Sequence, residues 1–380
     1  MPQWSPKARR IDKDDIRAHM EMAKSHMQAK RYDEAAQEFE LVLQDNPQVV
    51  LAHLGLGTTY FRQGRYDDAL QQFQEALNLD SSSAPARLMM ANVYLETGDT
   101  ERALELYEDA LELDPKLTQA HLHAGRIYAQ MERYPEAESH LRECLRYNPQ
   151  LTVARSLLAS IQQNQGNTEA ARLELEQVIA SKADSWSGYL QLGRLLLQQE
   201  NFAEAAEALE KAVELKQDNA MAPFFLGKAY MGLEQYEAAA AAFGAAVAQD
   251  PKMEQAKIQL AKAHMQQGKY TEAISLLQEL TRGKRKLVPV HRLLGDIYAA
   301  QGKHRQAVEE YQAALLHAPK FSQAHPDLAA IQEADVDDKT KAKAFQEAFS
   351  KLAAEVDEDT RKEIIQKMRR AAQVRRKGLV

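Results

Sequence analysis

Apolar and polar positions recur along this chain with a fixed period of 34 residues. The clearest marker is alanine, which occupies nine positions at this spacing: Ala35, Ala69, Ala103, Ala137, Ala171, Ala205, Ala239, Ala273 and Ala307. A large apolar residue follows each of them four positions later, on the same face of a helix. A period of this length indicates one supersecondary unit repeated head to tail, in which each copy buries its apolar face against its neighbours.

Each alanine lies on the second helix of its copy, and another helix, the first of the copy, is predicted before it. Twelve positions earlier, every copy carries glycine or alanine: Ala23, Gly57, Ala91, Gly125, Ala159, Gly193, Gly227, Ala261 and Gly295. An aromatic residue often follows three positions later, as at Tyr60 and Tyr128. Because the separation of two packed helices depends on the side chains at their contact, the small residues predict a close crossing within each pair.

The predicted turns agree with these helices. Proline follows the alanine by twelve positions in five copies, where the second helix should end: Pro47, Pro115, Pro149, Pro251 and Pro319. Glycine precedes the alanine by five positions in five copies, in the turn that joins the two helices: Gly64, Gly98, Gly166, Gly268 and Gly302. Each copy is therefore predicted to be helix, short turn, helix, short turn.

This arrangement resembles the tetratricopeptide repeat, whose pattern runs W-x2-L-G-x2-Y, then A-x3-F, then P over 34 residues. The match covers nine copies, residues 16–321, without an insertion. The resemblance implies an all-α fold, a right-handed superhelical α-solenoid of antiparallel helix pairs. Copies five and eight depart most from the pattern, with Gln162 and His264 at the tyrosine position, and we expect the stack to be softest there.

One departure from the family pattern is systematic: none of the nine copies has tryptophan at the tryptophan position, and most have a polar residue there. Its occupants are His19, His53, Arg87, His121, Arg155, Tyr189, Pro223, Lys257 and His291. Four of the eleven histidines thus share one repeat position and are spread along the stack rather than gathered.

The ends of the chain are predicted to differ from the repeats. Residues 1–15 read as an extension in which Asp14 or Asp15 caps the first helix. Residues 322–357 read as a partial tenth repeat and a helix that caps the stack. The apolar stripe of that capping helix is Phe345, Phe349, Leu352 and Val356. Residues 358–380 read as a basic amphipathic tail helix.

Charge divides the chain unevenly. Residues 361–380 carry a net charge of +7, so a total of −7 leaves −14 on residues 1–360. The basic tail residues that we single out are Arg369, Arg370, Arg375, Arg376 and Lys377. Three interpretations stay open for the tail: a solvated end helix, a membrane-surface contact or a partner-binding arm. A second basic cluster at 282–286 is interpreted as a solvated loop, with a phosphate or nucleic-acid contact as the alternative.

Neither a membrane span nor an active site is predicted. The longest apolar run, residues 238–248, is shorter than the roughly 18 residues that a span requires. Residues 1–10 lack the apolar core of a secretory signal, so we expect a cytoplasmic protein. Cys144, the only cysteine, takes a position that usually holds alanine, which favours a buried and inert thiol over a reactive one. No nucleotide loop, metal set or catalytic constellation occurs, so we expect no cofactor and no enzyme activity.

If the resemblance holds, the first helices of the copies line a concave groove, and ligands contact their second, fifth, ninth, twelfth and thirteenth positions. Counted from residue 16, the ninth position is basic in five of nine copies, and the fifth is largely apolar. The predicted partner-binding residues are Lys24, Leu54, Phe61, Leu88, Asn92, Leu122, Arg126, Leu190, Arg194, Met221, Phe224, Lys228, Met231, Ile258, Lys262 and Met265. Basic and apolar positions side by side suit a partner segment with acidic side chains and apolar anchors.

The leading hypothesis is therefore a non-enzymatic scaffold that binds a protein partner, a peptide or helix, and assembles a complex. The first alternative is that the apolar positions pack against neighbouring turns, against the protein's own tail or against a second copy. The last of these would make a homo-oligomer. The second is docking to nucleic acid or an anionic membrane through the tail, of which nucleic acid is the weaker candidate because the body is acidic and the basic cluster has no interleaved aromatics.

Overall fold

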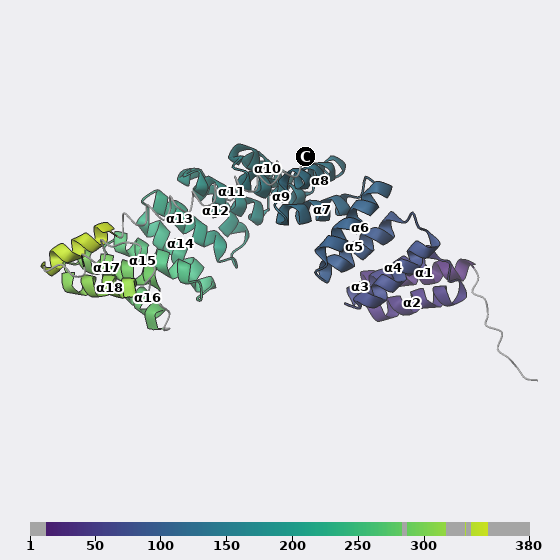
Figure 1. Ribbon diagram of the computed structural model, residues 1–380, viewed down its shortest axis with the longest axis horizontal. Helices are drawn as coiled ribbons and strands as arrows, with labels where there is room; N and C mark the ends of the chain where they lie inside the picture. Colours follow the sequence, from purple (N-terminus) through teal and green to yellow (C-terminus); the bar gives the residue numbers. More distant parts are fainter. Residues whose placement is uncertain (1–12, 283–286, 317–330, 332–335, 349–380) are drawn as a thin grey trace, which may run out of the picture. The chain divides into compact units, whose positions relative to one another are not determined.

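A computed structural model describes residues 13–282, 287–316, 331 and 336–348. In these ranges the chain is helical and contains no strand. The helices are α1 (Lys13–Gln28), α2 (Tyr32–Asp45), α3 (Val50–Arg62), α4 (Tyr66–Leu79), α5 (Ala84–Glu96), α6 (Thr100–Leu113), α7 (Thr118–Gln130), α8 (Tyr134–Tyr147), α9 (Thr152–Asn164), α10 (Thr168–Ser181), α11 (Trp186–Gln198), α12 (Phe202–Leu215), α13 (Met221–Gly232), α14 (Tyr236–Gln249), α15 (Glu254–Gln266), α16 (Tyr270–Arg282), α17 (Val288–Ala300) and α18 (His304–Leu316) (Figure 1). Residues 338–348 form a further helix.

Odd-numbered helices are the first helices of the nine copies, and even-numbered helices are the second. Each first helix packs along the second helix of its own copy, as α3 does on α4 and α17 on α18. The predicted array of helix pairs is thus confirmed as an all-α solenoid. The chain divides into two compact units, residues 1–184 and 185–380, and the boundary falls directly after copy five.

The repeated alanines lie at the centre of each helix pair. Ala69, Ala103 and their counterparts in the other copies have no exposed surface, or almost none. The large residue one turn later packs onto the small residue of the first helix. A Cβ atom built on Gly227 would lie 2.6 Å from the Phe243 ring, and one built on Gly193 would lie 2.4 Å from Leu209. The predicted close crossing is therefore present, and it interlocks a small and a large residue.

The turn between paired helices has the same backbone conformation in every copy. The residue five positions before the alanine has a positive φ in all nine copies. Five of these residues are the predicted glycines, and the other four are Lys30, Glu132, Glu200 and Glu234. Because a side chain disfavours the left-handed region, four copies keep this turn at an energetic cost that the five glycines avoid.

The departure at the tryptophan position also has a structural explanation. In five copies the polar side chain there bonds to the residue 19 positions later on the second helix, as His53 Nδ1 does with Gln72 Oε1 at 2.8 Å and Arg155 with Glu174 at 2.9 Å. The same side chain often donates a second bond to a carbonyl six positions earlier, as His53 Nε2 does to Pro47 at 2.9 Å. These polar bridges tie the second helix and the preceding turn to the first helix.

The first helix begins at a different residue from the one predicted. The prediction that Asp14 or Asp15 caps the first helix is wrong, because α1 begins at Lys13 and both aspartates lie in its first turn. Acidic residues are favoured both at a cap and in a first turn, so their presence does not fix the boundary.

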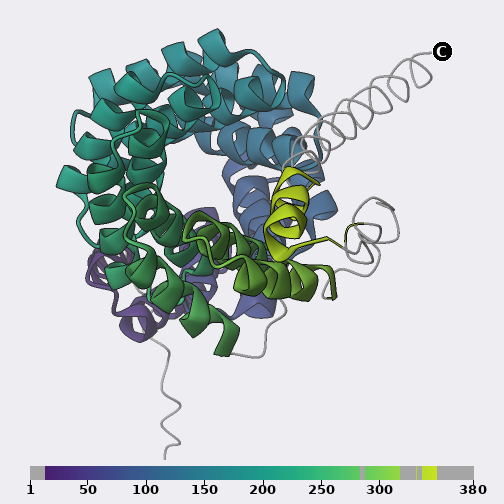
Figure 2. The ribbon, with the colours of Figure 1, turned by 90° about the vertical axis from the view of Figure 1, so that its left-hand side faces the viewer.

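At the other end, residues 338–348 form a helix, yellow in Figure 2, within the segment for which a cap is predicted. Its fully buried Phe345 packs on Tyr311 of the last repeat, with ring centroids 5.8 Å apart. The rest of the predicted apolar stripe, and the tail helix, lie outside the described residues.

Candidate functional site

Within the described part of the chain, no three or more His, Cys, Asp or Glu side chains cluster in a way that could hold a metal ion. Cys144 is buried as predicted, its thiol lies 3.4 Å from the Thr118 carbonyl oxygen, and burial raises the pKa of the thiol. A raised pKa disfavours the thiolate, which is the nucleophilic form. Among the helices that the structure describes, none has the length and apolar character needed to cross a bilayer.

The ninth positions of the first helices fall into two groups. Lys24, Arg194 and Lys228 are exposed, whereas Arg126 and Lys262 are half-buried. Of the basic residues at this position, only the first three are thus exposed to solvent.

The apolar positions also differ in accessibility. Half-buried side chains are those of Leu54, Phe61, Leu122, Leu190, Met231, Ile258 and Met265. Met221 is 41% exposed. The expectation that the fifth position faces a ligand does not hold at two sites, since Leu88 and Phe224 are only 5% and 6% exposed. Both pack into the hydrophobic core between helices, where a partner would reach little of their surface.

Asn92 has a role inside the protein. The Tyr107 hydroxyl donates a hydrogen bond of 2.6 Å to its side-chain oxygen. Tyr311 makes the same bond to Asp296 at 2.7 Å in copy nine, the last of the array. In both copies the large residue after the alanine is tyrosine, and the residue at the ninth position can accept a hydrogen bond from its hydroxyl. A buried hydroxyl needs such a partner, and this pairing could have been read from the sequence.

Two exposed cations of the second unit converge on one aromatic ring. The Arg194 guanidinium carbon lies 5.1 Å from the centroid of Phe225, and the Lys228 ammonium lies 5.7 Å from it. We call these three residues the basic–aromatic cluster. Phe225 stands at the sixth position, which is outside the set that the resemblance implies for ligand contact. Copy seven alone has phenylalanine there, and that was the signal available in the sequence.

Lys262, in contrast, belongs to an internal charge network. It lies near Arg292 and Asp296 of α17, whose own side chains are 3.8 Å apart. Burial, and to a lesser extent Arg292, lowers the pKa of Lys262, while Asp296 acts in the opposite direction. A lysine that shares a carboxylate with a neighbouring arginine offers less attraction to an external anion than an exposed one does.

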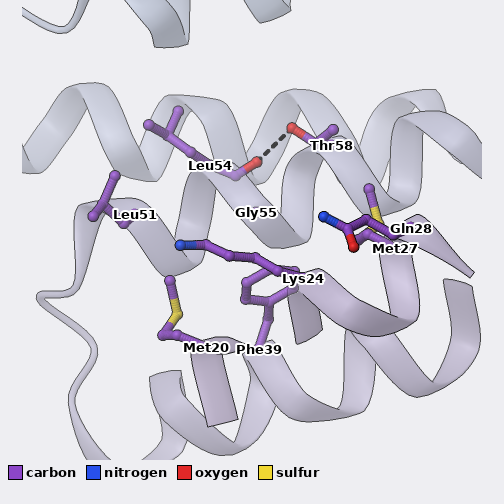
Figure 3. A pocket seen from close by; sticks show the side chains of 9 residues that line it. All are labelled: Met20, Lys24, Met27, Gln28, Phe39, Leu51, Leu54, Gly55 and Thr58. Atoms are coloured by element: carbon purple, nitrogen blue, oxygen red, sulfur yellow. Dashed lines mark hydrogen bonds between the residues drawn. The ribbon is translucent and has the colours of Figure 1, made fainter. Parts of the chain in front are cut away.

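The first unit holds a pocket instead of a basic–aromatic cluster. It has a volume of about 420 Å³ and is formed by α1, α2 and α3. Its lining residues are Met20, Lys24, Met27, Gln28, Phe39, Leu51, Leu54, Gly55 and Thr58. Figure 3 shows the Lys24 side chain across the pocket, with Leu51 and Leu54 on the side of α3. Two predicted groove residues, Lys24 and Leu54, are thus brought together here.

Two predicted features fall outside the described residues. The basic tail residues lie in 349–380, and most of the basic cluster lies in 283–286. The predicted interactions of both segments stay predictions.

Family models account for most of the repeat array. Models described as tetratricopeptide repeat match residues 14–82 and 49–116, residues 88–150 and 157–220, and residues 232–297 and 266–332. The chain belongs to the tetratricopeptide repeat family. Repeats of this family act in protein–protein interaction, which supports an interaction scaffold in general terms.

Several solved structures are similar to the chain. A tetratricopeptide repeat protein from Parabacteroides merdae is 24% identical, with a TM-score of 0.47, over 66% of this chain and 98% of its own. The C-terminal part of a repeat-containing protein from Cytophaga hutchinsonii is 16% identical, with a TM-score of 0.53, over 63% and 99%. YrrB, described as having an unusual peptide-binding site, is 24% identical, with a TM-score of 0.43, over 48% and 95%. No curated protein matches the chain.

Proposed function

We propose that this protein is a non-enzymatic scaffold that binds an acidic segment of a partner protein with apolar anchors and thereby assembles a complex. The observation that carries the proposal is the basic–aromatic cluster of the second unit. Arg194 and Lys228 are exposed, and no acidic partner of either is found among the described residues. A carboxylate between them would be attracted by two cations at once.

The surrounding positions support an acidic partner. Across the second, fifth, sixth, ninth, twelfth and thirteenth positions of α11, α13, α15 and α17, the only acidic residue is Asp296. Four positions there are basic: Arg194, Lys228, Lys262 and Arg292. Residues 1–360 as a whole carry −14, so this face opposes the charge of the body around it. Local charge of the opposite sign steers an acidic segment toward this face and away from the rest of the surface.

Apolar contacts would supply the remaining affinity. Met221 is exposed and Met231 is half-buried on α13, the helix that carries Lys228 and Phe225. Methionine side chains adapt to differently shaped partners because they are unbranched and flexible. Leu190 and Ile258, half-buried on α11 and α15, extend the apolar surface.

The test compares a charge-reversed protein with a matched control. In the first variant Arg194 and Lys228 are both changed to Glu. In the control the exposed Lys211 and Lys252, which lie on a second helix and in a turn, are changed to Glu. A fluorescent peptide that alternates leucine and glutamate is the probe, with a lysine-for-glutamate peptide as its counterpart.

Wild type and control should bind the acidic peptide in fluorescence anisotropy, more weakly at high salt, and the charge-reversed protein should not. Affinity capture from the native source with the same variants would then identify the natural partner. Equal binding of the acidic peptide by all proteins, or equal binding of both peptides by wild type, would contradict the proposal. A cytoplasmic location stays a prediction from the sequence.

A further inference from the structure

We propose that the pocket formed by α1, α2 and α3 is a second binding site, which takes one bulky apolar side chain from a foreign segment with an acidic residue beside it. The site is distinct from the basic–aromatic cluster, since all its lining residues lie in the first unit. Its existence therefore does not depend on the function proposed for the cluster.

The pocket depends on a glycine that no other copy has. The sixth positions of the nine copies are Glu21, Gly55, Met89, His123, Leu157, Gln191, Phe225, Gln259 and Leu293. At Gly55 the missing side chain lets the Phe39 ring pack against the backbone of α3. A Cβ atom there would lie 2.3 Å from the ring. The Phe39 ring thus takes the space that a side chain at this position would fill, and the ring and the bare backbone of Gly55 both line the pocket.

The walls of this pocket are apolar and adaptable. Met20 and Met27 come from α1, and Leu51 and Leu54 come from α3. Leu51 is 67% exposed, so its side chain gains most by being covered. The volume of about 420 Å³ falls in the roughly 300–1,000 Å³ range of small-ligand sites, which is ample for one leucine, methionine or phenylalanine side chain.

The charge at the pocket selects the partner. Lys24 is exposed and is the only charged residue of the lining, and no ion pair of Lys24 occurs within the described part of the chain. Thr58 is already engaged, because its hydroxyl donates to the Leu54 carbonyl at 2.7 Å. A carboxylate next to the inserted side chain would therefore have Lys24 as its counterion.

The protein's own N-terminal segment fits this site less well. Residues 1–12 include the aromatic Trp4, but they carry Lys7, Arg9 and Arg10 against a single acidic residue, Asp12. A segment with net positive charge would bring cations toward Lys24. Charge complementarity thus favours a foreign acidic segment.

The test observes the pocket directly in the full-length protein by NMR, with ¹³C-labelled methionine methyl groups. Met20 and Met27 report on the pocket, and Met22, an exposed residue of α1 outside the lining, serves as an internal control. The probes are 4-methylpentanoate and 3-phenylpropionate, which join an apolar tail to a carboxylate, and 3-phenylpropylamine, which carries the opposite charge. Ligands this small should bind in the millimolar range.

Both carboxylates should shift the Met20 and Met27 signals to saturation and leave Met22 unchanged. The carboxylates should bind several-fold more tightly than the amine, and Lys24→Glu should reverse that order. Leu51→Asp should weaken carboxylate binding. The matched controls are Lys116→Glu, in an exposed turn, and Leu173→Asp, where the leucine is 63% exposed; both should bind the carboxylates as wild type does.

Several results would overturn the proposal. Absence of a saturable shift for both carboxylates would exclude the pocket as a site, and equal binding of carboxylate and amine would exclude an acidic partner. Movement of the Met20 and Met27 signals on deletion of residues 2–12 would assign the pocket to the protein's own segment. Movement on dilution would assign it to a second copy. The Arg194 and Lys228 double variant should bind these probes as wild type does, so failure here is distinguishable from failure of the cluster.

Discussion

The first helices α3 and α13 stack in the same way but present different surfaces to a partner. Both place glycine at the crossing with the second helix, Gly57 against Phe73 and Gly227 against Phe243. At the sixth position, however, α3 has Gly55 beside a pocket, whereas α13 has Phe225 beneath two cations. The stacking positions thus set the fold in both units, while the residue at the sixth position sets the chemistry of the surface.

The largest effect should come from the stacking positions, and it should be alike in both units. Phe73→Ala and Phe243→Ala each remove a fully buried ring, so each should destabilise its unit by about 3–5 kcal/mol. Urea unfolding, followed by hydrogen exchange of each helix, would measure the loss. Leu215→Ala, at a 41% exposed position, should change stability by only about 0.5 kcal/mol. Clearly unequal losses of stability from the two phenylalanine changes would show that the stacking positions do not contribute alike in the two units.

A smaller effect should separate the sixth positions. Gly55→Ala places a methyl group against the Phe39 ring and should destabilise the first unit by about 1–3 kcal/mol. Phe39→Leu should relieve the clash, because Leu209 fills the same repeat position before Phe225. A double-mutant cycle in urea would therefore show positive coupling between the two changes. Additive losses would mean that the ring does not restrict this position.

The turns offer a stabilising change of similar size in both units. Glu132→Gly in the first unit and Glu200→Gly in the second should each raise stability by about 0.5–1 kcal/mol, since both residues have positive φ. Gly64→Ala should lower it by a comparable amount. Thermal unfolding would measure each change. Gly244→Ala is the control, because that glycine is helical and its added Cβ meets no atom within 4 Å. A loss of stability on Glu→Gly would contradict the strain assigned to this turn.

The smallest effect should be a pH dependence that is stronger in the first unit. Burial lowers the pKa of His123 on α7 and of His140 on α8; His121 lowers that of His140 further and Glu108 opposes it. Above about pH 6.5 neither state is protonated. Below it, the unfolded chain binds protons that the folded chain does not, so stability falls until the folded pKa values are reached.

Hydrogen exchange between pH 7 and 5, corrected for intrinsic rates, should show α7 and α8 losing protection. In the second unit burial lowers the pKa of one histidine, His264, against two in the first unit, so the loss there should be smaller. His123→Gln should reduce the pH dependence of α7 and α8. An equal response of both units would contradict this assignment.

The sequence predicted the helices, the pairing and the turns because those properties repeat, and nine copies average out the exceptions. It was less informative about exposure. Leu88 and Phe224 share their repeat position with half-buried residues, and burial at a single site depends on how neighbouring helices pack. The hydrogen bond of Asn92 to Tyr107 links two helices, so it is predicted only when the ninth position is compared with the large residue on the second helix of the same copy. Gly55 and Phe225 stand at the sixth position, outside the set that the family resemblance implies for ligand contact, and each is the only residue of its type there among the nine copies.

The polar bridges at the tryptophan position have a consequence for how such an array can be recombined. In such a bridge, a histidine or arginine bonds to a carbonyl six residues before it and to a side chain 19 residues after it. Both bonds therefore lie within one segment that begins at the residue with that carbonyl. The bridge of His53, for example, lies between Pro47 and Gln72. A cassette cut immediately before the closing proline, such as 115–148, contains His121 with both of its partners. Insertion or deletion of whole cassettes at these cuts would leave each bridge intact, so the array can change length in steps of one repeat without separating the groups that lock each unit together.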